Sequence, residues 1–460
     1  MPMSVSSPGP IPEVSIQRMQ PGDMADPRAG TLFGFTPDSW VRLYRDVGPV
    51  FRFAETGLTF LCGPEANAAA WKTPDDWSYA ASRTGAMFIS QFGADYITAS
   101  DGDVHRRQRK LLRPAISRDA LGRHVQGMLA ELDGAFSELA AHGSEVDLHD
   151  ALIVVYTRAF NRSTVVSGAD AAMIDAIARF EEEMILGGSL HGAEQAAWYA
   201  RPSYLALRAH VLGHFRRLVL RRLGGARADD SLDLVIDLMR TQGALSAVHA
   251  DAELEELTRH AYLLQAGGAG NIASMVCNLL AELVLNPDWL RAVEAEVRID
   301  PQVLAVRGVQ DMPLLSALLQ EAERRLAPTP IMPKVARRDL DFLGVAIPRG
   351  LEVLHLFGVA NFLPEAYPEP MRFDPLRWQG GKARKPVAFG GGEHMCLGID
   401  VARLYLLLSV VALLRSFRLE CSGLPRYRRV DEGDPGSPLR LGWQVRISPR
   451  DADAPANASG

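Results

Sequence analysis

The sequence has few cysteines, and their spacing excludes two common kinds of site. Only four occur among 460 residues, at positions 62, 277, 396 and 421, and none of them forms a C-x-x-C pair. This spacing favours neither a disulfide framework nor a zinc site. It is typical of a protein kept in a reducing cytoplasm, which is the location we expect.

A strong charge of one sign and a long apolar N-terminal run are also absent. The formal net charge of −6 gives no indication of nucleic-acid binding. The first thirty residues are rich in Pro, Met, Ser and Gly, with no apolar run of membrane-spanning length and no signal-peptide pattern. We therefore expect a soluble protein without a membrane anchor.

What is present is a composition and periodicity typical of a large helical protein. The chain is 47% hydrophobic and 23% charged. Apolar residues recur with a helical period from Asp103 onward, whereas residues 49–64 predict a β-hairpin. We expect a mainly α protein with a minor β subdomain. We divide the chain into an irregular segment 1–30, a single domain 31–450 and a disordered tail 451–460.

The motif with the most chemical content runs from Phe389 to Gly398. Three glycines, residues 390–392, precede Cys396, and an apolar helix is predicted from Ile399 to Phe417. Backbone N–H groups at the start of that helix favour an ionised sulfur. The glycines allow the backbone to lie flat against a planar group. Thiolate ligation of heme iron needs both properties. The alternative is a buried structural cysteine beside a glycine-rich turn.

This motif resembles the heme-binding loop Phe-Gly-x-Gly-x-(Arg/His)-x-Cys-x-Gly of the cytochrome P450 family. The resemblance implies the fold of that family, a triangular helical prism around heme b, in its soluble bacterial form. It implies that Cys396 is the axial ligand of the iron. The matching positions are Phe389, Gly390, Gly392, His394, Cys396 and Gly398, and all of these except Gly392 are expected to bind the heme.

A second cluster lies on the helix predicted from Asp103. His105 and Arg109 are four residues apart and therefore project from one helix face. Taken alone, such a pair is usually a solvated face, but the family resemblance implies that it binds a heme propionate. Lys334 replaces the arginine with which the family contacts a propionate, and it keeps the charge but loses the fork geometry.

Basic residues surround both motifs and suggest a redox partner. In the resembled family they lie on the cysteine side of the heme, where they would attract an acidic ferredoxin or flavodoxin. Ordinary surface charge is the alternative. The residues are Arg106, Arg107, Lys110, Arg113, Lys382, Arg384 and Lys385.

Residues 251–285 predict one long helix that contains three glycines within four positions. Each glycine costs about 1 kcal/mol relative to alanine in a helix. We therefore expect close approach by another group, or tight helix packing, at this point. In the resembled family this is the distal helix, written Ala-Gly-x-(Asp/Glu)-Thr-Thr. Here Ala269 and Gly270 occupy the acid and alcohol positions, and neither can donate a proton. Water, a substrate hydroxyl, Asn271 or Gln265 must then replace them.

Further positions follow from the resemblance. Glu321 and Arg324 are expected to form a structural network with Arg372 of the Pro-x-Arg-Phe motif, and Arg377 is the weaker candidate for that place. The substrate pocket is expected to be mainly apolar, although core packing explains each residue as well. Its expected residues are Phe88, Ile89, Phe92, Leu264, Gly268, Ala269, Ile331 and Met332.

Three functional hypotheses follow. The first is a heme-thiolate oxidoreductase, a monooxygenase that oxidatively tailors an apolar secondary metabolite, with protons partly supplied by substrate or water. The second is a peroxide-dependent or non-oxygenating reaction, such as radical coupling or rearrangement, because the distal helix lacks its proton relay. The third is a non-catalytic heme protein that acts as a partner. Retention of Cys396 argues against the third hypothesis.

Overall fold

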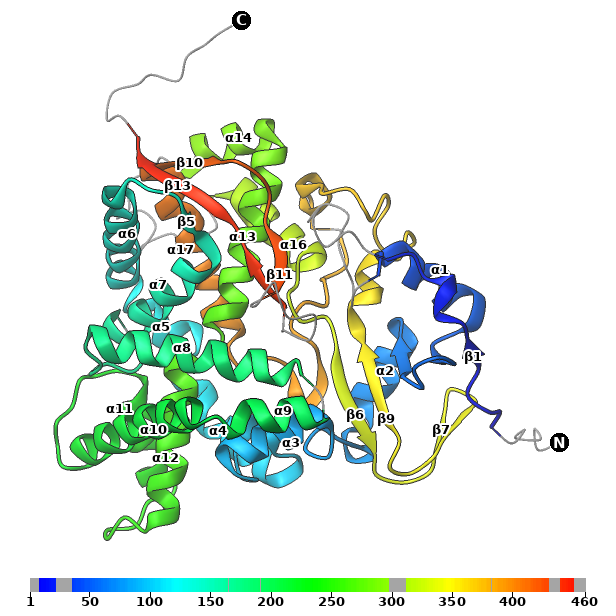
Figure 1. Ribbon diagram of the computed structural model, residues 1–460, viewed down its shortest axis with the longest axis horizontal. Helices are drawn as coiled ribbons and strands as arrows, with labels where there is room; N and C mark the ends of the chain where they lie inside the picture. Colours follow the sequence, from blue (N-terminus) through cyan, green and yellow to red (C-terminus); the bar gives the residue numbers. More distant parts are fainter. Residues whose placement is uncertain are drawn as a thin grey trace, which may run out of the picture.

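The computed structural model describes residues 8–21, 35–163, 165–190, 192–297, 312–381, 383–429 and 439–450. Helices dominate these residues (Figure 1). They are α1 (Pro37–Val47), α2 (Pro64–Lys72), α3 (Arg83–Phe92), α4 (Gly102–Ala115), α5 (Arg118–Gly122), α6 (Val125–His142), α7 (Leu148–Ser163), α8 (Ala171–Gly188), α9 (Gly192–Ala200), α10 (Pro202–Leu223), α11 (Ser231–Thr241), α12 (Asp251–Ala266), α13 (Ala269–Leu285), α14 (Pro287–Val297), α16 (Pro313–Arg325) and α17 (Ile399–Ser416).

The strands form one larger sheet and three small ones. The larger sheet has the order β1-β2-β3-β9-β6-β4; the others are β10-β13-β5, β11-β12 and β7-β8. The strands are β1 (Glu13–Val14), β2 (Val50–Phe53), β3 (Thr59–Cys62), β4 (Trp77–Ser78), β5 (Val146–Asp147), β6 (Met332–Ala336), β7 (Leu340–Phe342), β8 (Val345–Ile347), β9 (Glu352–Leu356), β10 (Phe417–Cys421), β11 (Arg426–Arg429), β12 (Leu439–Gly442) and β13 (Gln444–Pro449).

The N-terminal part of the chain follows the sequence prediction in its hairpin. β2 and β3 pair antiparallel, as predicted for residues 49–64. The segment expected to be irregular contains the short strand β1, which pairs parallel with β2. Residues 1–7 and 22–34 and the expected tail 451–460 lie outside the described residues.

Side-chain caps fix where several helices begin. Ser82, Asp170 and Asp230 each accept a hydrogen bond from a backbone N–H in the first turn of α3, α8 and α11. Such caps satisfy amides that have no partner within the helix. The short polar residue before each apolar helical run is therefore what sets its start.

Two of the four apolar clusters among the described residues matter most for the position of the site. The larger one lies among the helices, where α13 packs against α7 and α17 (Figure 1). The smaller one joins α1 to the larger sheet through Trp40, Phe51, Phe53 and Phe60. The rings of Trp40 and Phe60 are 5.0 Å apart. Aromatic pairs at this separation stabilise the contact between helix and sheet.

The helix predicted over residues 251–285 is interrupted, so the expectation of one continuous helix is wrong. α12 ends at Ala266, α13 begins at Ala269, and Gly268 between them has φ +117°. Only glycine adopts this backbone conformation readily. By length and composition this stretch is the one candidate membrane span among the described residues, and 61% of its most apolar window is buried inside the protein.

Candidate heme site

The cysteine loop is folded by its glycines and by contact with α2. Gly390 and Gly392 both have φ +68°, a conformation that favours glycine. The loop closes where the Cys396 N–H donates to the Phe389 carbonyl at 2.9 Å. A Cβ placed on Gly391 would lie 2.6 Å from the Trp71 ring, so the ring packs directly on the backbone. The loop is thus held rigidly just before α17 begins at Ile399.

The side chain of Cys396 is accessible yet closely surrounded by protein atoms. Cys396 is an exposed residue, yet surrounding atoms are close enough that burial raises the pKa of its thiol. The Gly398 N–H and the Arg109 guanidinium lower the same pKa and favour the thiolate. Two features expected to favour a ligating thiolate, a backbone N–H and a cation, are therefore present.

His105 and Arg109 lie on one face of α4, as predicted, and both contact the cysteine loop. Arg109 donates to the Met395 carbonyl at 2.7 Å. The two ring nitrogens of His105 lie 2.9 Å from the Ile97 carbonyl and 3.2 Å from the Glu393 carbonyl. Burial lowers the pKa of His105 to about 4, and the nearby His394 and Arg109 lower it as well. A neutral ring donates to only one carbonyl. A neighbouring anion would favour the imidazolium, which donates to both.

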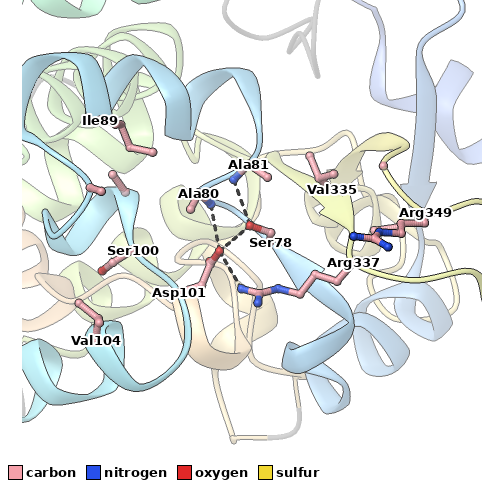
Figure 2. Close-up of a pocket in the computed structure, with 14 residues that line it drawn as sticks. Ser78, Ala80, Ala81, Ile89, Ser100, Asp101, Val104, Val335, Arg337 and Arg349 are labelled. Carbon is pink, nitrogen blue, oxygen red and sulfur yellow. Dashed lines mark hydrogen bonds and ion pairs between the residues drawn. The ribbon is translucent and has the colours of Figure 1, made fainter.

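His394 is held by Asp101, a residue that sequence reasoning missed. The His394 Nε2 lies 3.0 Å from Asp101 Oδ1. Figure 2 shows the same carboxylate accepting bonds from Ser78, Ala80 and Arg337, beside a cavity of about 670 Å³. Burial alone would raise the pKa of Asp101, but the bonds from His394 and Ser78 hold it well below its usual range. Asp101 stands at the N-cap of α4, but its side chain does not cap the helix. An aspartate just before a predicted helix was the only signal in the sequence, and it indicates a cap.

Lys334 places a buried cation beside the loop. It lies on β6, and its side chain lines a small hollow together with Trp71, Tyr79 and His394. The ammonium has no hydrogen bond or ion pair among the described residues, and burial lowers its pKa. A buried charge without an anionic partner is costly. An anion bound in this hollow would offset that cost.

On the distal side, open space borders Gly268 and Gly270, the second of which stands at the alcohol position of the family. No heavy atom lies within 4 Å of the position that a Cβ would take on Gly268 or Gly270. At these two glycines the predicted close approach is not observed. Of the alternative donors, Gln265 is turned away, because its amide donates to the Thr157 carbonyl at 2.7 Å. Asn271 accepts from the Thr329 hydroxyl at 3.3 Å.

The expected substrate-pocket residues divide into packed and partly accessible ones. Phe92 and Leu264 are buried in the larger core cluster, and the Phe92 ring stacks 5.0 Å from that of Tyr262. Ala269 is fully buried. The partly accessible ones are Phe88, Ile89, Gly268, Ile331 and Met332.

The structural network forms with a different arginine from the one predicted. Arg324 donates to both carboxylate oxygens of Glu321, at 2.7 and 3.0 Å. The third member is Arg377, whose Nε lies 3.1 Å from Glu321 Oε2. The Arg372 guanidinium instead pairs with the exposed Glu369 at 3.5 Å, so the prediction that its side chain joins the network is wrong; only its backbone carbonyl accepts from Arg324 and Arg377. The 3₁₀ turn η6 (Pro375–Trp378) carries Arg377 back toward α16, which packs against it.

These residues fit a heme. The Cys396 sulfur is accessible yet surrounded, the buried ammonium of Lys334 makes no ion pair among the described residues, and two distal glycines border open space. A heme supplies iron for the sulfur, carboxylates for the cations and a planar ring for the open space. The fold and this set of donors define a heme-thiolate protein.

Comparison with known proteins gives the family. The family model for cytochrome P450 matches residues 215–434. Cytochrome P450 88A1 of Zea mays is 26% identical over 87% of this chain and 81% of its own length. The putative cytochrome P450 139 of Mycobacterium tuberculosis is 26% identical over 79% of this chain and 86% of its own length. The retinoic acid-bound cyanobacterial CYP120A1 superposes with a TM-score of 0.73 at 20% identity, over 96% of this chain and 100% of that one.

The chain is similar to cytochrome P450s over most of its length, in sequence and in fold. It is therefore a heme-thiolate oxidoreductase with heme b as its cofactor, and its mainly α fold with a minor sheet is the fold of that family. The recognition, the fold class and the cofactor predicted from the cysteine loop are confirmed.

Replacing Lys334 with methionine separates heme binding from folding. We expect the heme affinity to fall by about 10-fold or more, because a charge-assisted hydrogen bond contributes about 1.5–3 kcal/mol. Without heme, the variant is expected to be at least as stable as the parent, because the lone buried cation is gone. Heme transfer to a scavenging apoprotein and thermal unfolding of the apoprotein measure the two effects. Lys110→Met on the exposed side of α4 is the control, and an equal loss of affinity there would contradict the assignment.

Proposed function

We propose that the protein is a monooxygenase that oxidatively tailors an apolar secondary metabolite. The observation that carries the proposal is the accessible Cys396 thiol at the end of its glycine-rich loop, together with the open space beside Gly268 and Gly270. A relative that is 25% identical over 70% of this chain, from Streptomyces melanosporofaciens, is named a cyclooctat-9-en-7-ol 5-monooxygenase, and this name supports such a substrate class.

In this proposal, the residues on the two sides of the heme site have different roles. Cys396 binds the iron, while Arg109, Lys334, His105 and His394 bind the propionates. The bound heme-thiolate supplies the chemistry of dioxygen activation. Apolar residues near the distal glycines exclude bulk water and orient the substrate.

We further propose an acidic ferredoxin or flavodoxin as the electron donor. Four basic residues remain exposed, with no ion pair among the described residues: Lys110, Arg113, Arg384 and Lys385. Arg106 and Arg107, by contrast, are paired with Glu393 and Glu256, and Lys382 lies outside the described residues. Unpaired surface cations raise the association rate with an acidic partner. We assign the protein to the cytoplasm, where such partners operate.

Comparing two oxidants tests the proposal. The heme-loaded protein is supplied either with reduced ferredoxin and dioxygen or with hydrogen peroxide, after a binding screen that follows the iron spin state has found a ligand. We expect product with ferredoxin and dioxygen. Product with peroxide alone would favour the second candidate, a peroxide-dependent or non-oxygenating reaction, which the absence of an acid–alcohol pair at Ala269 and Gly270 also supports.

A further inference from the structure

A carboxylic acid from another helix reaches the break between α12 and α13. Glu181 lies on α8, and its Oε1 accepts a hydrogen bond of 3.4 Å from the Gly268 N–H. That amide lies between the two helices, so the break leaves it free for a side chain. The second oxygen, Oε2, is buried and has no hydrogen-bond partner among the described residues. An unpartnered buried oxygen in a native fold calls for an explanation.

The surroundings of Glu181 keep this acid protonated. Burial raises its pKa to about 8, and the Gly268 N–H offsets only part of that rise. The titratable groups that face it are the phenols of Tyr96 and Tyr262, whose own pKa values are raised by burial. Arg259, also on α12, donates to the Phe92 carbonyl instead. Because Oε1 accepts from an amide, the proton resides on Oε2, which then has a hydrogen to donate and no acceptor.

The position of this acid matches what the distal helix lacks. Gly268 directly precedes Ala269, which stands at the acid position of the family motif, and open space borders Gly268 and Gly270. We propose that Glu181 supplies from α8 the distal acid that α12 and α13 lack, holding an exchangeable proton at the helix break for the oxygenation. This inference rests on the proposed monooxygenase function.

The proton balance is simple. In a monooxygenation, one oxygen atom of dioxygen enters the substrate and the other leaves as water, which takes up two protons, while the reduced redox protein supplies two electrons. Glu181 releases the Oε2 proton and becomes a carboxylate that still accepts from Gly268. It regains a proton from solvent, by way of the open space that borders the helix break at Gly268. No bond to carbon changes at Glu181.

Infrared spectroscopy of the resting holoenzyme tests the proton directly. We expect a protonated-carboxyl band at pH 7 that titrates near pH 8, is lost in Glu181→Gln and remains in Glu182→Gln. The glutamine keeps an oxygen that accepts from Gly268, and residue 182 faces another side of the helix. If Glu181→Gln does not accumulate, Glu181→Asp is expected to shift the band. Absence of the band, or its persistence in Glu181→Gln, would overturn the proposal.

Dioxygen consumption with reduced ferredoxin and no added substrate tests the use of that proton. We expect Glu181→Gln to be about 100-fold slower than the parent, which is the lower end of a general-acid contribution. The parent rate is expected to fall above about pH 8, whereas the variant has no such dependence. Equal rates and equal pH profiles would overturn the proposal. A parent holoenzyme that consumes no dioxygen would instead overturn the monooxygenase function, and the infrared titration would still decide the protonation of Glu181.

Discussion

Replacing Glu321 with alanine is expected to lower the free energy of unfolding by about 3–5 kcal/mol, because it leaves the buried Arg324 guanidinium and the partly buried Arg377 guanidinium without their carboxylate. Glu321 accepts hydrogen bonds from Arg324, Arg377, the Trp378 indole and the Asp374 backbone. Arg324 also donates to the Asn361 carbonyl, and the Asn361 amide binds the Val387 backbone just before the cysteine loop. Chemical denaturation of the holoenzyme measures the loss, and heme release is expected to accompany it.

The two arginines provide the matched comparison. Arg377→Ala is expected to cost about 1.5–3 kcal/mol, because it removes one charge-assisted bond from a buried carboxylate. Arg372→Ala is expected to change the free energy of unfolding by no more than about 0.5 kcal/mol, because its guanidinium is exposed. The reverse order would show that Arg372 is the network member after all.

The same network makes stability fall in acid. Burial alone would raise the pKa of Glu321, but the hydrogen bonds and charge of Arg324, with the contacts from Asp374 and Arg377, outweigh that effect, so the pKa is lowered. A carboxyl group with a lowered folded pKa stabilises the fold above its unfolded pKa, and that contribution is lost as the pH falls through the folded value. Glu321→Ala is expected to lack this contribution.

Replacing Cys396 with histidine is expected to abolish dioxygen-driven product formation while heme remains bound. The imidazole provides a ligand for iron, but it lacks the electron donation by which a thiolate favours O–O cleavage. The rate is expected to fall toward the uncatalysed level, about 10⁶-fold or more below that of a typical enzyme. Product formation and heme content, measured on the same sample, separate loss of chemistry from loss of cofactor.

Cys421→Ala is the matched control for this variant. Cys421 lies on β10, and its side chain packs against the larger core cluster rather than in the cysteine loop. Its replacement is expected to leave both the heme content and the product formation within about twofold of the parent. Retained activity in the Cys396→His protein would contradict the assigned ligand.

Sequence reasoning succeeded where the signal is local. The turn before α17 needs glycine at positions 390 and 392 because both have positive φ, and such a requirement is visible in the residues themselves. The i,i+4 spacing likewise placed His105 and Arg109 on one face of α4. These local features placed the side chains, whereas their assignment to a heme came from the resemblance of the loop to the motif of the family.

It failed where a residue depends on distant parts of the chain. The break at Gly268 was missed because a helix pattern tolerates single glycines, and only the φ of +117° shows that the helix stops. The motif Pro-x-Arg-Phe favours Arg372, and the sequence does not show that η6 folds back to bring Arg377 to Glu321. Glu181 belongs to a run of three glutamates on a helix, a pattern typical of a solvated face, and its partner is 87 residues away.

The two sides of the candidate heme site have different roles. On one side a rigid loop holds the Cys396 sulfur with a cation and a backbone amide nearby. On the other side the helix break removes the usual donors, and the buried acid of α8 stands at that break. The role of Glu181 depends on Cys396 being the ligand of the iron, because a distal acid has no role without a reaction at the iron.

The reduced, carbon monoxide-treated holoenzyme provides the most direct measurement of this claim. We predict the strongly red-shifted Soret band of a thiolate-ligated heme in the parent protein, and a band of the histidine-ligated type in Cys396→His. A parent protein that binds heme without the red-shifted band, or a Cys396→His protein that keeps it, would contradict the account.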